Sequence, residues 1–142
     1  MSETEENLMQ RLCDLNIACT TLRHPAVSTV EESKRLRGDL PGGHCKSLFL
    51  KDKKGRLYLV VALEDREINM KRSRKLLGAA QLSFGRPELL MEVLGVIPGA
   101  VTPFGLINDN ERQVHVVLDC EMMKQDLLNY HPLTNEATTS IA

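Results

Sequence analysis

Residues 95–105 carry three glycines and two prolines between two apolar stretches of the chain. Glycine permits positive φ and close approach of the backbone, whereas proline fixes φ and removes an N–H donor. This composition favours a stiff loop that presents its remaining backbone N–H groups to a bound molecule. An irregular crossover between two strands fits the same spacing, so the residue types leave both interpretations open.

Lys46 is a candidate cation for such a site. It begins a predicted strand directly after a glycine-rich loop, and alternation places it on one face with Leu48 and Leu50, while Ser47 points to the other face. A lysine in this position fits a cation over the mouth of a pocket. It also fits a side chain that lies along an apolar surface and reaches out to water.

Other reactive side chains give weaker signals. His131 precedes Pro132, which favours extended backbone, and a lone histidine fits a structural role as well as a functional one. Cys45 adjoins Lys46 but points to the opposite face, and no Cys–His–Asp arrangement is legible, which disfavours a covalent cysteine mechanism. The carboxylates clustered at 64–67 lack metal-ligand spacing. We therefore expect neither a metal nor another cofactor.

Four separate blocks of the sequence occur in the order found in one known family. The chain resembles the YbaK/ProRS-editing-domain family of aminoacyl-tRNA deacylases from His24 to Thr139, with the Gly-x-x-x-Pro loop at Gly99 and Pro103. Several blocks in order are far more specific than one short motif. The other three blocks cover residues 42–52 (Gly-Gly-His-Cys-Lys-Ser-Leu-Phe-Leu-Lys-Asp), 104–109 (Phe-Gly-Leu-Ile-Asn-Asp) and 131–135 (His-Pro-Leu-Thr-Asn).

The resemblance implies a hydrolase that removes the amino acid from mischarged tRNA, with Ala-tRNA(Pro) as the expected substrate and prolyl-tRNA synthetase as a candidate partner. It implies that Lys46 holds the terminal phosphate or ester region and that His131 positions water or the ribose. The loop fits stabilisation of the oxyanion by the backbone N–H groups of Gly99, Ala100 and Val101. The 2′-hydroxyl of the terminal adenosine would help to activate the attacking water. The expected substrate contacts come from Ser47, Ala100, Val101, Thr102, Pro103 and Asn135.

Two departures from the family pattern leave alternatives open. Ser47 stands where the family usually has Asn, and the family continues past the position of Ala142 through a further helix and strand. Residues 1–142 are therefore expected to form an editing domain that lacks this C-terminal part, and an uncovered apolar face would favour a homodimer. The alternatives are a non-catalytic module that binds tRNA or the synthetase, and a deacylase for Cys-tRNA(Pro) or another small aminoacyl group.

Composition fits a single globular domain. The chain has 142 residues, 42% of them hydrophobic, and a formal net charge of −1. With three Phe, two Tyr and no Trp, it lacks the exposed rings of a base-stacking platform. Its four cysteines show no Cys-x-x-Cys pair, which favours a cytoplasmic protein with free thiols. No window approaches 18 apolar residues, so no membrane span is expected. Clusters of Lys and Arg at 34–37, 51–56 and 71–75 fit solvated faces or phosphate contacts.

Helical periodicity, alternation and turn residues predict a mixture of helices and strands. Mixed helices and hairpins favour an α/β (α+β) domain with a mixed, mostly antiparallel sheet, and the resemblance implies a curled sheet with flanking helices. The predicted helices span 5–17, 28–37, 71–77, 87–94 and 121–128. The predicted strands span 19–24, 46–51, 56–63, 81–84, 104–107 and 113–118, with hairpins at 46–63 and 104–118.

Overall fold

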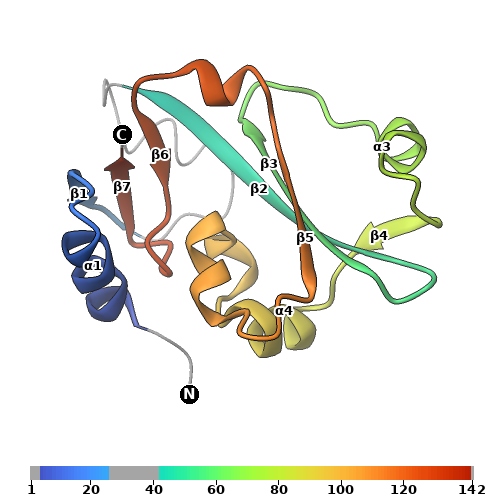
Figure 1. Ribbon diagram of the computed structural model, residues 1–142, viewed down its shortest axis with the longest axis horizontal. Coiled ribbons are helices and arrows are strands. Elements are labelled where there is room, and N and C mark those ends of the chain that lie inside the picture. The colour runs from blue at the N-terminus through green and yellow to red at the C-terminus, as the bar shows by residue number, and fades with distance from the viewer. Residues whose placement is uncertain (1–3, 26–41, 142) are drawn as a thin grey trace.

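The protein is one domain built on an open, seven-stranded sheet with flanking helices (Figure 1). The computed structural model describes residues 4–25 and 42–141. The strand order is β1-β7-β6-β2-β3-β5, and β4 pairs with β2 outside this path. Four of the six strand pairs are antiparallel, which confirms the predicted mixed, mostly antiparallel sheet. The main elements are α1 (Glu5–Asp14), β1 (Cys19–Arg23), β2 (Gly43–Asp52), β3 (Leu57–Leu63), α3 (Met70–Leu77), β4 (Leu82–Phe84), α4 (Pro87–Leu94), β5 (Val114–Leu118), β6 (Leu128–Tyr130) and β7 (Ala137–Ile141).

The central β2–β3 hairpin confirms the alternating pattern of its sequence. Its antiparallel register is continuous over seven residue pairs. The turn is closed by the buried side chain of Asp52, whose Oδ1 accepts hydrogen bonds from the amides of Lys54 at 3.0 Å and Arg56 at 2.8 Å. Gly55 supplies the left-handed backbone that this turn requires, with φ of 86°.

The two faces of this hairpin carry separate apolar cores. The face that we call the α4 face packs alternate residues of both strands against α4, namely Phe49, Leu59 and Val61 against Leu90, Val93 and Leu94. The opposite face, which we call the α3 face, packs Leu50, Tyr58 and Val60 against Met70 and Leu77 of α3. A side chain on β2 therefore points to the α4 face or to the α3 face according to whether its position in the strand is odd or even.

Both central helices end where the sequence predicts. α4 begins with Pro87 and stops at Gly95, which adopts left-handed backbone with φ of 69°. α3 begins one residue earlier than expected because the Asn69 side chain accepts a hydrogen bond from the amide of Arg72 at 3.1 Å. It stops at Gly78, again left-handed with φ of 64°.

The predicted hairpin at 104–118 is wrong. Residues Pro103–Asn108 form a 3-10 helix, η2, and β5 pairs in parallel with β3. Gly105 explains the helical turn, because a Cβ there would lie 3.1 Å from the Cβ of Leu94, so this segment packs closely against α4. The side-chain amide of Asn108 donates to the carbonyl of Leu94 at 2.8 Å, which ties η2 to the end of α4.

The predicted helix at 121–128 is also wrong. It is replaced by a single 3-10 turn, Met122–Lys124, followed by β6, and β7 was not predicted at all. The helix predicted at 28–37 lies outside the described residues. None of the helices in residues 4–25 and 42–141 has the length and apolar character needed to cross a bilayer.

Candidate functional site

The edge of β2 that faces β6 and β4 is paired at its two ends. Gly43 and His44 pair with β6, and Leu50 and the two residues after it pair with β4. Between these ladders, residues 45–48 have no strand partner on this edge within the described part of the chain. We call this stretch the β2 gap. An unpaired edge offers backbone N–H and C=O groups to a ligand, so the gap is a natural place for a site.

Lys46 and Ser47 both lie in the β2 gap but point to opposite faces. Ser47 pairs with Val61, which is buried in the core of the α4 face, whereas Lys46 pairs with Ala62 and lies on the α3 face. Lys46 is half-buried as a whole residue, and its ammonium donates an exposed hydrogen bond to the backbone carbonyl of Arg66. The Lys46 ammonium therefore contacts the turn after β3 and not the loop at 99–103.

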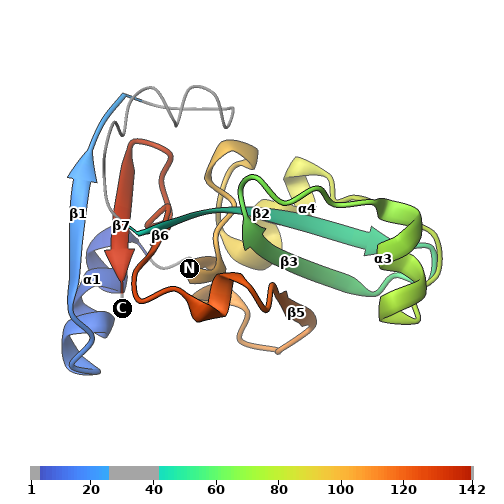
Figure 2. The same cartoon turned by 90° about the horizontal axis from the view of Figure 1, so that it is seen from above.

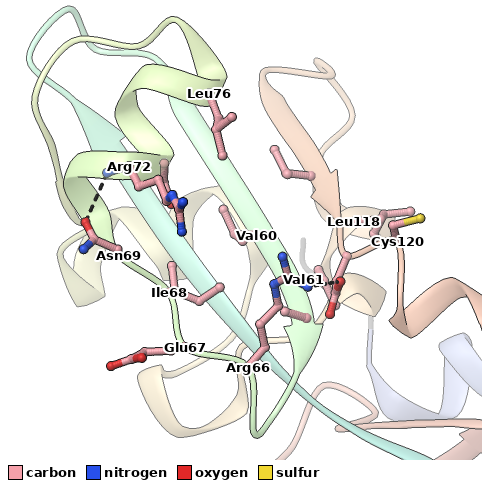
Figure 3. Close-up of a pocket in the computed structure, with 14 residues that line it drawn as sticks. Val60, Val61, Arg66, Glu67, Ile68, Asn69, Arg72, Leu76, Leu118 and Cys120 are labelled. Atoms are coloured by element: carbon pink, nitrogen blue, oxygen red, sulfur yellow. Dashed lines mark hydrogen bonds and ion pairs between the residues drawn. The ribbon is translucent and has the colours of Figure 1, made fainter.

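The turn that receives Lys46 is held in place by Asp119, which follows β5. Oδ1 of Asp119 accepts from the Arg66 guanidinium at 3.1 Å, and Oδ2 accepts from the amide of Leu63 at 3.2 Å. Beside this turn, a groove of about 600 Å³ runs between α3 and β5 (Figure 3). Arg66, Arg72 and Leu76 are among the residues that line it.

The loop at 99–103 is anchored in the core of the α4 face. Ala100 is fully buried, and its amide donates to the carbonyl of Ile97 at 2.9 Å within the 3-10 helix Pro98–Ala100, η1. Val101 packs against the same core. Thr102 is fully buried, and its hydroxyl accepts from the amide of Phe104 at 3.2 Å. The Thr102 side chain is thus occupied in capping η2, and the loop is anchored at both Ala100 and Thr102.

Aromatic contacts connect this loop to β6. The ring of Phe104 meets that of Tyr130 edge to face, with centroids 5.7 Å apart. The Tyr130 hydroxyl donates to the sulfur of Met122 at 3.3 Å. Because His131 directly follows Tyr130, this packing fixes the start of the 131–135 block relative to the loop.

His131 is half-buried, and its surroundings favour the neutral imidazole. Burial lowers its pKa, the carbonyl of Ala137 raises it, and His24 lowers it, with a net fall below the ordinary value. Since a carbonyl can only accept, Nδ1 of His131 donates to Ala137 at 3.0 Å. The neutral ring then keeps Nε2 as a hydrogen-bond acceptor, which could orient a water or a ribose hydroxyl.

His24 is a candidate site residue that the sequence analysis missed. Its ring lies 6.3 Å from that of His131, at an angle of 65°. Nδ1 donates to the carbonyl of Pro25 at 2.9 Å, so Nε2 accepts from the hydroxyl of Thr138 at 2.8 Å. One signal was available in the sequence, because both histidines belong to His-Pro dipeptides.

Cys45 lies in the β2 gap on the α4 face, but its thiol is not in the nucleophilic thiolate form at neutral pH. Burial raises the pKa of its thiol to about 11, although hydrogen bonds with Tyr130 and the backbone of Asn129 act in the lowering direction. The thiolate is the reactive form of cysteine. At neutral pH the side chain is therefore a protonated thiol, which agrees with the weak case for a cysteine mechanism in the sequence.

The structure brings together part of the predicted site. Val101, Tyr130, Leu133 and Cys45 pack against one core on the α4 face, which places the loop, the start of the 131–135 block and the β2 gap around it. Pro103 begins η2 and is half-buried, as is Asn135 in the turn before β7. Lys46 is not gathered with them, since it lies on the α3 face.

Comparisons with known proteins identify the family of this chain. The family model for the aminoacyl-tRNA editing domain matches residues 24–142. A zebrafish (Danio rerio) prolyl-tRNA synthetase associated domain-containing protein 1 is 40% identical over 141 residues, covering 98% of this chain and 77% of the relative. The prolyl-tRNA editing protein ProX of Acetoanaerobium sticklandii is 34% identical, covering 99% of this chain and 86% of the relative.

A solved structure shows the same fold. A crystal structure described provisionally as a trans-editing enzyme for prolyl tRNA synthetase superposes with a TM-score of 0.72 at 20% identity, covering 99% of this chain and 87% of that one. The fold, the family model and the two relatives lead to one conclusion: this chain belongs to the aminoacyl-tRNA editing domain family.

Proposed function

We propose that this protein hydrolyses the ester bond of mischarged aminoacyl-tRNA, with alanine on the tRNA for proline as its substrate. Family membership supports the reaction, and the names of the two relatives support prolyl-tRNA. The structural observation that carries the proposal is the anchoring of the 95–105 loop beside the β2 gap, in a core shared by Val101, Tyr130 and Cys45.

The loop would stabilise the charge that develops on the ester carbonyl. Gly99 lies in the first turn of η1, where backbone N–H groups have no acceptor within the helix. A fixed donor of this kind stabilises an oxyanion by about 3 kcal/mol without reorganising. The buried Ala100 and the capping side chain of Thr102 keep this turn rigid, so their contribution is to position the Gly99 amide.

Water would be the nucleophile. His131 offers a neutral Nε2 that can accept a hydrogen bond from that water or from the ribose, and the 2′-hydroxyl of the terminal adenosine would assist in taking the proton. No protein side chain needs to form a covalent intermediate. This scheme is consistent with the protonated thiol of Cys45.

Lys46 would bind the phosphate of the terminal nucleotide at the β2 gap. Its ammonium would have to exchange the Arg66 carbonyl for the phosphate, which is a stronger, charge-assisted acceptor. Because Lys46 and Ser47 leave the gap on opposite faces, the 3′ end of the tRNA would cross the unpaired edge, with its phosphate on the α3 face and its acyl group on the α4 face.

Small acyl groups are the expected substrates because of how synthetases make errors. A synthetase pocket shaped for proline rejects a smaller side chain such as alanine by only about 1–3 kcal/mol. A second site that admits alanine and excludes proline restores accuracy. Gly99 has no side chain, which would leave room for such a group.

A second function, binding of tRNA without hydrolysis, is favoured by one observation. The Lys46 ammonium rests on a protein carbonyl on the α3 face, away from the loop that would hold the ester. If this arrangement persisted in the complex, the chain would bind the tRNA end and leave the ester intact.

The two functions are separated by a deacylation assay with the tRNA for proline charged with alanine, cysteine or serine. We expect release of alanine to be fastest, and Lys46→Ala to reduce it by at least about a hundredfold, since the phosphate contact and the alignment that it provides are both lost. Lys51→Ala is the matched control, because Lys51 is an exposed lysine of the same strand.

Folding of both variants is checked by circular dichroism and by Tm. A folded Lys46→Ala protein that turns over at the parental rate would overturn the assigned role of Lys46. A parent protein that binds the tRNA but releases none of the three amino acids would overturn hydrolysis and establish the binding function.

A further inference from the structure

α3 carries an unusual concentration of positive charge for a chain of net charge −1. Four of its eight residues are Lys or Arg, and none is acidic. The four side chains are exposed, and none of them forms an ion pair with any residue in the ranges 4–25 and 42–141. These cations, which we call the α3 cations, are Lys71, Arg72, Arg74 and Lys75.

The α3 cations are displayed on a rigid support. Met70 and Leu77 pack into the core of the α3 face. The Asn69 cap fixes the first turn, and the amide of Ala79 donates to the carbonyl of Arg74 at 3.0 Å, which closes the last turn. Little backbone ordering is therefore left for a partner to induce, so a bound polyanion would meet a preformed surface.

A hollow lies at the C-terminal half of α3. It has a volume of about 630 Å³ and is lined by Lys71, Arg74, Lys75, Gly78 and Ala79, so all of its charged lining residues are cations. The negative end of the helix dipole opposes an anion here. Three full positive charges outweigh a partial charge of about half a unit, and the small side chains of Gly78 and Ala79 leave room for a phosphate group.

The opposite flank of α3 borders the groove described above. Figure 3 shows Arg72 and Leu76 extending from α3 over the floor formed by Val60. Cations thus face both flanks of one helix, a spread that suits successive phosphates along a backbone better than one isolated anion. Composition disfavours a base-stacking platform, because the chain has five aromatic residues and no Trp.

The α3 cations also share a face with Lys46. Leu48 and Leu50 follow Lys46 on this face of β2 and pack into the core beneath α3. Six residue steps from Lys46 to Asp52 span about 20 Å. A nucleic acid whose terminal phosphate is held at Lys46 could therefore run along this face and reach α3 with phosphates further from its end.

We propose that the α3 cations bind the phosphate backbone of the tRNA acceptor stem while the 3′ end occupies the β2 gap. This inference rests on the proposed function and extends it by assigning a surface to the double-stranded part of the substrate. Duplex RNA is recognised through phosphates and 2′-hydroxyls more than through base edges, which agrees with a surface of cations on one helix. The contact is expected to be independent of tRNA sequence.

The test measures binding of uncharged tRNA as a function of salt, which needs no hydrolysis. The variant Lys71→Gln/Arg74→Gln/Lys75→Gln removes the three cations of the hollow and keeps good helix formers. We expect tRNA affinity to fall at least about tenfold and the slope of log affinity against log salt to become shallower by about 3. Arg74→Gln alone should change the slope by about 1.

Arg11→Gln is the matched control, since Arg11 is an exposed arginine in the last turn of α1. α1 lies at the opposite end of the molecule from α3 in both views (Figures 1 and 2). This control should bind tRNA like the parent and show the parental salt slope. If the triple variant kept the parental affinity and salt slope with an unchanged Tm, the proposal would be overturned. This outcome is also the one expected if α3 binds an acidic protein partner instead of tRNA.

A second measurement keeps this proposal separate from the proposed function. The triple variant should raise KM for full-length Ala-tRNA(Pro) at least about tenfold and leave turnover of alanyl-adenosine, which has no acceptor stem, unchanged. An equal rise of KM in both substrates would overturn the assignment to the stem. If the parent protein bound tRNA with the expected salt dependence but hydrolysed neither substrate, the proposed hydrolase activity would be overturned and the proposed tRNA-binding role of α3 would stand.

Discussion

Asp119 and Arg66 join the end of β5 to the turn after β3, with Nη1 of the guanidinium 3.1 Å from Oδ1 of the carboxylate. The Asp119 side chain is 3% exposed and that of Arg66 is 54% exposed, so the carboxylate is the fixed member of the pair. Because the backbone carbonyl of Arg66 accepts a hydrogen bond from Lys46, Asp119 helps to set where that ammonium rests.

Replacement of Asp119 by Ala should therefore lower both stability and substrate affinity. The amide of Leu63 loses its acceptor, at a cost of about 1–3 kcal/mol, and the turn that holds Lys46 is released. We expect a lower Tm together with a higher KM for aminoacyl-tRNA. Glu121→Ala is the control, because its pair with Lys124 is exposed and surface pairs contribute about 0–1 kcal/mol. A parental KM in Asp119→Ala would show that Lys46 finds its place without this turn.

Acid should destabilise the fold partly through His131. Its pKa is lowered in the folded state, mainly by burial, so the unfolded chain takes up a proton at a higher pH than the folded one. The contribution of neutral His131 to stability is fully present above the ordinary pKa of about 6.5 and is lost as pH falls below it. Calorimetry should show a steeper fall in Tm between about pH 7 and 5 for the parent than for His131→Gln.

His115→Gln is the control for this pH dependence, since His115 is an exposed residue of β5. It should keep the parental slope of Tm against pH. Parallel slopes for the parent and His131→Gln would contradict a lowered pKa of His131 in the folded protein.

Cys45 should be the least reactive of the thiols that can be compared with it. Its pKa of about 11 leaves a negligible thiolate fraction at neutral pH, whereas Cys13 and Cys120 are exposed. Iodoacetamide followed by mass spectrometry should label Cys13 and Cys120 well before Cys45. Cys45→Ala should also retain deacylation within a few fold, and a loss of activity comparable to that of Lys46→Ala would instead implicate the thiol in the reaction.

Thr102 should contribute through its hydroxyl and not through contact with substrate. Thr102→Val keeps the side-chain shape but removes the acceptor for the amide of Phe104, which should cost about 1 kcal/mol and lower Tm by a few degrees. Thr102→Ser keeps the acceptor and should retain more of the stability. If Thr102→Val matched the parent in Tm, the cap would not support the loop.

Local signals predicted the centre of the fold. The alternation of β2 and β3, the Pro87 start of α4 and the Gly78 and Gly95 stops act over a few residues, so one sequence is enough to read them. The stiffness of the loop at 99–103 stays a prediction from the same local chemistry.

The parts that were mispredicted depend on distant partners. β5 looks like one arm of a hairpin, yet its neighbour is β3, more than fifty residues earlier. β6 has three residues, and β7 reads Ala-Thr-Thr-Ser-Ile, too polar to be recognised as a buried strand without its partners. The opposite orientation of Lys46 and the loop likewise follows from tertiary packing, although the parity of Lys46 in β2 was correctly predicted.

The pairing of β1 with β7 has a consequence for synthesis on the ribosome. Thr21 pairs with Thr139, so the first strand to be translated cannot pair with β7 until 118 further residues have been synthesised. Until then Cys19–Arg23 is an open edge that a neighbouring nascent chain could join. The slowest step of folding should therefore be the closing of this long-range ladder, as expected when loop-closure entropy precedes any gain from contacts.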